Sequence, residues 1–151
     1  MRLPDAFDQA TADLITEYLP ASVLEFARVI GLESSITLCR ELGGVNIRIP
    51  VRESSRVAQH LIRVVGREKA LLMMSEFGGT GEEFFIPRCS QAIRILRNRE
   101  IVGAFDRLTM EMSSQDAVTE LSIKYRLTYR QIENIVSSSA TDTRNTLKRS
   151  A

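Results

Sequence analysis

The sequence predicts a mainly α-helical protein with a small β element, in which tandem helix and strand units precede a C-terminal helix-turn-helix. Three observations lead to this prediction. A block of residues occurs twice, apolar residues recur at helical spacing through most of the chain, and the last third carries two amphipathic segments around a tight turn. We therefore expect a repeated supersecondary unit followed by a different module.

The duplicated block is defined by its glycines. RVIGLE at 28–33 is matched by RVVGRE at 63–68, and ELGG at 41–44 is matched by EFGG at 76–79. Both pairs lie 35 positions apart, and each copy then reaches an Ile-Pro pair, with two extra residues in the second copy. A fixed offset of this kind indicates one structural unit used twice.

The elements follow in order along the chain. A helix over residues 5–19 comes first and ends at Pro20. Within each copy a glycine allows a bend between two helices, and a Gly-Gly pair ends the second helix. A strand and a proline follow, and each proline can start the next helix. The predicted elements are helices over 21–30 and 33–42 with a strand over 45–49 in the first copy, and helices on either side of Gly66 with a strand over 82–86 in the second.

The two strands need partners, because a single strand is not stable alone. They are expected to pair either with each other or with the strands of a second copy of the chain. Pairing with each other would make an internal pseudo-dimer, and it could replace the partner strand and leave the protein a monomer. The residues assigned to this strand and dimerisation region are Val45, Ile47, Ile49, Phe84, Phe85 and Ile86.

The segment over residues 114–136 has the pattern of a helix-turn-helix. Ser113 or Ser114 can cap the first helix, and its inner face carries apolar residues at three- and four-residue steps. The turn is Arg126 to Thr128, and Thr128 can cap a short second helix. Ile132, Ile135 and Val136 are predicted to point inward from that helix.

The outer face of the second helix is rich in groups that can read base edges. Arginine suits guanine, and glutamine or asparagine suits adenine. The four arginines between residues 88 and 99 have no acidic neighbours in that segment and could contact DNA phosphates. The same patterns also fit a structural hairpin and the solvated face of an amphipathic helix, so both interpretations stay open at this level.

Composition excludes several other classes. The chain has 151 residues and a formal net charge of +1, which describes an ordinary globular protein. No apolar run is long enough to span a membrane and no signal peptide is evident, so a cytoplasmic location is expected. Cys39 and Cys89 lie in unlike contexts and lack histidines at ligand spacing, so neither a zinc site nor a disulfide is expected and both are interpreted as reduced packing residues. His60 is the sole histidine and no phosphate-binding loop is present, so we expect no enzyme activity and no cofactor.

The C-terminal half resembles the Mor family of transcription activators from Mu-like phages. The resemblance covers residues 68–136, and the Gly-Gly to Ile-Pro element joined to the helix-turn-helix is its most specific part. The residues that carry it are Gly78-Gly79, Phe85-Ile86-Pro87-Arg88, Arg97-Asn98-Arg99-Glu100-Ile101, Phe105, Glu120-Leu121, Lys124-Tyr125, Leu127-Thr128, Arg130, Ile132 and Ile135.

The resemblance implies an activator that binds promoter DNA as a homodimer and recruits RNA polymerase. The base-reading set would be Thr128, Tyr129, Arg130, Gln131 and Asn134. The DNA backbone would be contacted by Arg88, Arg94, Arg97, Arg99, Lys124 and Arg126, with Arg88 at the junction between strand and DNA-binding unit. The alternative is a regulatory protein that does not bind DNA and instead associates with a related activator or with polymerase.

Two residues depart from the usual motif. Arg126 stands in the turn where glycine is common, and the left-handed conformation there costs a non-glycine residue roughly 1 kcal/mol. Ser122 stands where alanine usually lets the helices approach, and its hydroxyl could bond back to Val118.

The sequence predicts four regions. They are an N-terminal helix over 1–20, a tandem scaffold or dimerisation region over 21–87, a DNA-binding region over 88–136, and a flexible tail over 137–151.

Overall fold

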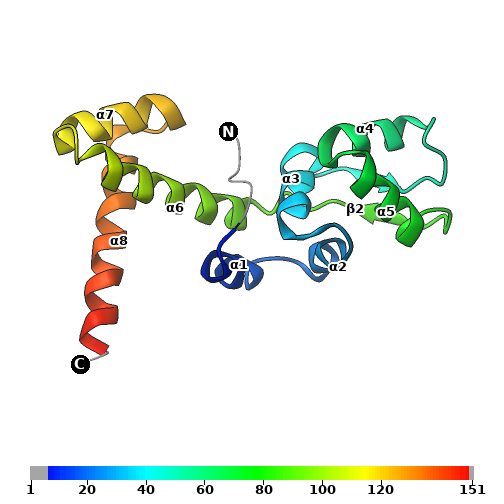
Figure 1. Ribbon diagram of the computed structural model, residues 1–151, viewed down its shortest axis with the longest axis horizontal. Helices are drawn as coiled ribbons and strands as arrows, with labels where there is room; N and C mark the ends of the chain where they lie inside the picture. Colours follow the sequence, from blue (N-terminus) through cyan, green and yellow to red (C-terminus); the bar gives the residue numbers. More distant parts are fainter. Residues whose placement is uncertain (1–6, 150–151) are drawn as a thin grey trace. The chain divides into compact units, whose positions relative to one another are not determined.

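The computed structural model describes residues 7–149 and the side chains of residues 7–139. The chain divides between Ile93 and Arg94 into two compact units, and each is described by itself. The described residues are mainly helical with one two-stranded antiparallel sheet, which confirms the predicted fold class. The elements, coloured along the chain in Figure 1, are α1 (Gln9–Thr16), α2 (Ala21–Ile30), α3 (Leu32–Leu42), β1 (Asn46–Arg48), α4 (Arg56–Val65), α5 (Arg67–Phe77), β2 (Glu83–Phe85), α6 (Ser90–Leu108), α7 (Ser114–Tyr125) and α8 (Tyr129–Arg149).

The duplication is visible in the backbone of the first unit. Gly31 joins α2 to α3 with φ +87° and ψ 158°, and Gly66 joins α4 to α5 with φ +88° and ψ 158°. A positive φ of this size suits glycine, which has no Cβ to clash. The two copies therefore use the same helix, glycine and helix arrangement, as the matched spacing predicts.

The two strands pair with each other inside one chain. Ile47 of β1 lies opposite Phe84 of β2, and these residues occupy equivalent places in their copies because the offset is 37 after the two-residue insertion. Flanking hydrogen bonds match as well: Gly44 N–H donates to the Ile86 carbonyl at 2.7 Å, and Gly79 N–H donates to the Ile49 carbonyl at 3.3 Å. Of the two pairings left open by the sequence, the internal one is observed.

The helices of the first unit follow the same internal symmetry. α2 packs against α5, and α3 packs against α4, so the first helix of each copy contacts the second helix of the other copy. Lys69 Nζ donates to Ser34 Oγ at 2.5 Å across this arrangement, and these two residues lie 35 positions apart. The first unit is thus an internal pseudo-dimer with a local two-fold relation.

The core of the first unit is built where the copies meet. Phe26 of α2 is buried and its ring lies 5.5 Å from Phe77 of α5 and 6.0 Å from Phe84 of β2, measured between ring centroids. Phe77 and Phe84 contact each other edge to face at 5.6 Å. These geometries are favourable for aromatic pairs and join both helices and the sheet in one cluster.

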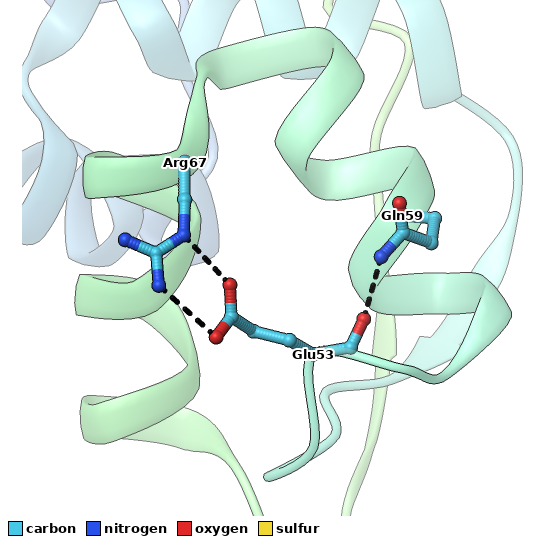
Figure 2. A network of polar contacts seen from close by, with 3 residues as sticks. All are labelled: Glu53, Gln59 and Arg67. Carbon is cyan, nitrogen blue, oxygen red and sulfur yellow. Dashed lines mark hydrogen bonds and ion pairs between the residues drawn. The ribbon is translucent and has the colours of Figure 1, made fainter.

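The predicted helix starts at the two prolines are wrong. α4 begins at Arg56, where the Ser55 side chain accepts a hydrogen bond from Ala58 N–H, and this cap fixes the start six residues after Pro50. Figure 2 shows how the intervening turn is held. The Glu53 carboxylate accepts hydrogen bonds from Arg67 Nε at 2.8 Å and Nη2 at 3.2 Å, and its carbonyl accepts one from Gln59. After Pro87, α6 likewise begins only at Ser90.

The second unit has one core made by α6, α7 and α8. Its buried residues are contributed by all three helices, and half-buried apolar side chains surround them. The buried members are Ile101, Ala104, Val118, Leu121 and Ile132, and the surrounding ones include Phe105, Leu108, Tyr125, Leu127, Ile135 and Val136. The inward residues predicted for the last helix are therefore those that reach the core.

The last helix is longer than predicted. α8 runs without interruption from Tyr129 to Arg149, so the prediction of a short second helix is wrong and the region assigned to the tail is helical through Arg149 (Figure 1). No glycine or proline occurs between these residues to end the helix. The absence of apolar periodicity after Ser137 is therefore no argument against a helix.

Candidate nucleic-acid interface

The junction between α7 and α8 is a tight turn with a well-defined start to the second helix. Thr128 Oγ1 accepts a hydrogen bond from Gln131 N–H at 3.1 Å, and Gln131 Oε1 accepts one from Thr128 N–H at 2.9 Å. This reciprocal pair is a capping box, which satisfies two backbone donors that a helix start leaves open. The orientation of the first turn of α8 is therefore fixed by its own side chains.

The turn before this cap contains a left-handed residue at the position where glycine is common. Arg126 has φ 54° and ψ 41°, and Leu127 N–H donates to the Ser122 carbonyl at 3.3 Å to close the end of α7. Ser113 caps the other end of α7 by accepting from Asp116 N–H at 3.1 Å. Short-range contacts thus define both ends of α7, and the core fixes its inner face.

The five residues predicted to read bases divide into two groups. Thr128 and Gln131 take part in the capping box, so their side chains hold the helix start. Tyr129, Arg130 and Asn134 lie on the solvent side of α8, with Tyr129 41% exposed. Within the described part of the chain, Arg130 and Asn134 form no side-chain hydrogen bond or ion pair, which leaves these polar groups available.

The predicted phosphate contacts lie in both units. Arg88 belongs to the first unit, where its guanidinium lies against Gly44; a Cβ at Gly44 would come within 2.8 Å of Arg88 Nε. Arg94, Arg97 and Arg99 lie on the part of α6 that belongs to the second unit. Arg97 is half-buried and donates from Nε and Nη2 to Asn98 Oδ1 at 3.2 and 2.9 Å, whereas the other two are exposed.

Two further cations lie at the end of α7. Lys124 Nζ lies 5.3 Å from the centre of the Tyr125 ring, a distance typical of a cation over an aromatic face. Arg126 is exposed at the turn itself. Both positive charges therefore adjoin the exposed first turn of α8 along the chain.

Two polar groups are enclosed behind this surface. Burial raises the pKa of Tyr125 to about 12, and the neighbouring Glu100 carboxylate adds to the effect. The Ser122 hydroxyl is buried and, among the side chains that the structure describes, finds no hydrogen-bond partner, so the bond to Val118 that its position suggested is not made. These groups affect the stability of the α7 and α8 pair and do not face the solvent.

The six predicted strand residues form the internal ribbon and its borders. Ile47, Ile49 and Ile86 are buried, and Phe84 is half-buried in the aromatic cluster. Val45 and Phe85 are 48% and 56% exposed. Since β1 and β2 pair with each other, these strands already have one partner within the chain.

Sequence reasoning missed one element of the interface and one pair elsewhere. The residue type of Gln131 suits base reading, but the spacing Thr128-x-x-Gln131 is itself the signature of a capping box. Cys39 and Cys89 come together with their Sγ atoms 3.3 Å apart. Their separation of 50 positions and their unlike sequence contexts gave no signal of this contact. Among the described residues there is no group of three or more side chains suited to a metal ion.

The fold and this surface define a small helical protein with a repeat-built unit and a three-helix unit that presents polar and basic groups at a fixed helix start. The sequence model of the Mor transcription activator family matches residues 53–150, well over half of the chain. The chain belongs to this family, and the resemblance noted from its motifs is confirmed. No match was found among curated proteins or among solved structures.

The family match has a clear relation to the fold. It includes α4, α5 and β2 of the second copy and continues through α6, α7 and α8, whereas the first copy lies before it. α1 and the helix pair and strand of the first copy therefore lie outside the matched region. No helix in the described range is both long enough and apolar enough to cross a membrane.

Proposed function

We propose that this protein is a sequence-specific DNA-binding transcription activator whose α7 and α8 pair acts as a helix-turn-helix. The observation that supports this most is the start of α8. There a capping box fixes the first turn, Arg130 and Asn134 are exposed beside it, and Ile132 anchors the opposite side in the core. Membership of a transcription activator family supports the same function.

The chemistry of this surface suits a major groove. Arginine can donate two hydrogen bonds to guanine, and asparagine can bond adenine through its amide, each contributing about 1 to 3 kcal/mol of discrimination. Thr128 and Gln131 would act as positioning residues that hold the helix start. Lys124, Arg126 and the exposed arginines of α6 would contact phosphates, which position the protein without reading sequence.

The expected number of chains on one operator follows from the affinity for DNA. One chain carries one such helix pair, and sequence-independent binding reaches only about 10⁻⁴ to 10⁻⁶ M at physiological salt. We therefore propose that two chains bind one operator as a homodimer, with half-sites about one helical turn apart. Because the paired edges of β1 and β2 are used within each chain, the two chains would associate through another surface.

RNA polymerase is the further partner that an activator requires. A protein that activates transcription in a bacterial host cell would act in the cytoplasm. Recruitment of polymerase is part of the proposal and rests on family membership. Its test is transcription from a promoter carrying the selected site, with and without the protein. A site that is bound with no increase in transcript would contradict the activator part and leave DNA reading intact.

The DNA-binding part is tested by charge reversal at the exposed turn. Arg130→Glu should abolish binding to duplex DNA, measured by fluorescence anisotropy, because it places an anion where the groove potential is negative. Arg56→Glu is the matched control, since Arg56 is also exposed but lies on α4 in the first unit. Circular dichroism would show that both variants are folded. Equal binding by Arg130→Glu and the unmodified protein would contradict the proposal.

A further inference from the structure

The two cysteines of this chain form a contact that the proposed DNA binding does not use. Cys39 lies on α3 in the first copy and is buried, whereas Cys89 lies between β2 and α6 and is half-buried. Their Sγ atoms are 3.3 Å apart and both thiols are free. A disulfide has a length of about 2.0 Å, so a movement of little more than 1 Å would bring the sulfurs to bonding distance.

The backbone around the pair is already held in place on both sides. Gly44 N–H donates to the Ile86 carbonyl, which fastens the end of β2 to the segment that follows α3. A Cβ at Gly43 would lie 2.8 Å from the Arg88 Cα, so only glycine permits this close approach of the chain beside Cys89. The contact between the sulfurs is therefore built into the fold and does not depend on two mobile loops.

Cys89 has an unusual backbone for its residue type. Its φ is +50°, in the left-handed region that residues other than glycine seldom adopt. Its carbonyl accepts the first hydrogen bond of α6, from Ile93 N–H at 3.0 Å. Strain of this kind persists only where the surrounding structure imposes it. Here it places the sulfur of Cys89 beside that of Cys39 at the start of α6.

The two thiols differ in their chemical character. The hydrogen bond with Cys39 lowers the pKa of Cys89, although burial opposes this effect. The same hydrogen bond and burial raise the pKa of Cys39. Because the thiolate is the nucleophile, the more accessible Cys89 is suited to react first and the buried Cys39 to react second.

We propose that Cys39 and Cys89 are a redox-responsive dithiol that a peroxide converts into an intrachain disulfide. The Cys89 thiolate attacks one peroxide oxygen, the O–O bond breaks, and hydroxide leaves and is protonated to water. The resulting sulfenic acid is attacked by the Cys39 sulfur; the S–S bond forms, the S–O bond breaks, and the hydroxide takes the Cys39 proton to leave as a second water. Two thiols lose two electrons and the peroxide gains them, and a dithiol reductant reverses the change.

The test uses the full chain treated with hydrogen peroxide. Intact-mass spectrometry should show the loss of two hydrogen atoms, and proteolysis should release a peptide pair linked through Cys39 and Cys89. Both thiols should resist alkylation until dithiothreitol is added. Peroxide treatment in urea is the matched control, since unfolding separates two sulfurs that lie 50 positions apart in the sequence, and the disulfide should then form more slowly.

Two variants assign the order of the steps. Cys39→Ser should leave Cys89 as a sulfenic acid that dimedone captures, whereas Cys89→Ser should leave the buried Cys39 unmodified under the same treatment. Circular dichroism would show whether each variant is folded. The test of disulfide formation in the unmodified chain does not depend on these variants. Disulfides between chains on a non-reducing gel, or two free thiols in the folded protein after peroxide treatment, would overturn the proposal.

Discussion

Replacing Arg126 with glycine should move stability and DNA affinity in opposite directions. Arg126 has φ 54° and ψ 41°, and the left-handed conformation costs an L-residue roughly 1 to 2 kcal/mol. Glycine removes this cost, but its greater conformational freedom stabilises the unfolded chain by about 0.4 to 1 kcal/mol. The net expectation for Arg126→Gly is a gain of about 1 kcal/mol in the free energy of unfolding.

The effect on binding comes from the lost charge. If Arg126 contacts one phosphate, its removal should reduce the slope of log affinity against log salt by about 0.9, and affinity should fall for all sequences alike. Arg126→Lys is the matched control because it retains both the charge and the backbone strain, so both measurements should stay near those of the unmodified protein.

Two assays decide the matter. Urea unfolding followed by circular dichroism gives the free energy of unfolding, and anisotropy titrations over a salt series give the slope. A variant that is less stable than the original would refute the strain argument. A more stable variant with an unchanged salt slope would refute the phosphate contact and leave the strain argument standing.

Three further predictions concern the same unit. Ser122→Ala should stabilise folding by about 1 kcal/mol in urea unfolding, because it removes a buried hydroxyl without a partner; a loss of stability would contradict this. Gln131→Ala should cost about 1 kcal/mol by breaking the capping box, with Glu133→Ala as a control on the exposed face, and equal stability of the two variants would count against the cap. The raised pKa of Tyr125 favours the neutral phenol in the folded state, so its stabilising effect is complete below pH 10 and is lost as pH rises toward 12. Tyr125→Phe should flatten this part of a pH titration of stability, and an unchanged decline would show that another group is responsible.

The repeat was predictable because its signal lies in local backbone chemistry. Gly31 and Gly66 occupy matched positions, and both adopt the positive φ that joins two helices. The pairing of β1 with β2 was one of two arrangements that the sequence left open, since alternation of apolar residues identifies a strand but not its partner. The choice depends on tertiary packing, which here joins Phe26, Phe77 and Phe84.

The errors have equally specific causes. Proline favours the first turn of a helix, but the Ser55 cap and the Glu53 to Arg67 ion pair place the start of α4 at Arg56, beyond Pro50. The outer half of α8 lacks an apolar face, which predicts a short helix. A helix that contains no glycine or proline can nevertheless continue beyond the residues that pack in the core. A contact such as that between the two cysteines depends on how distant segments pack, and no local pattern encodes it.

The candidate site was predictable in part. The Thr128 cap and the inward Ile132 are local or periodic features, and the structure places both as expected. Arg126 adopts the left-handed conformation although its residue type disfavours it. The sequence does not show which residues of the outer face hold the helix start and which are available to contact DNA, because this depends on the hydrogen bond that the Gln131 side chain makes.

The central claim is that the exposed first turn of α8 reads DNA sequence. Its most direct test is selection from a randomised duplex DNA pool with the unmodified protein and with Arg130→Ala. The account predicts a two-part site with half-sites about one helical turn apart, and loss of preference at one base pair in each half-site for the variant. No enrichment by the folded protein, or the same site with the same preferences for both proteins, would contradict it.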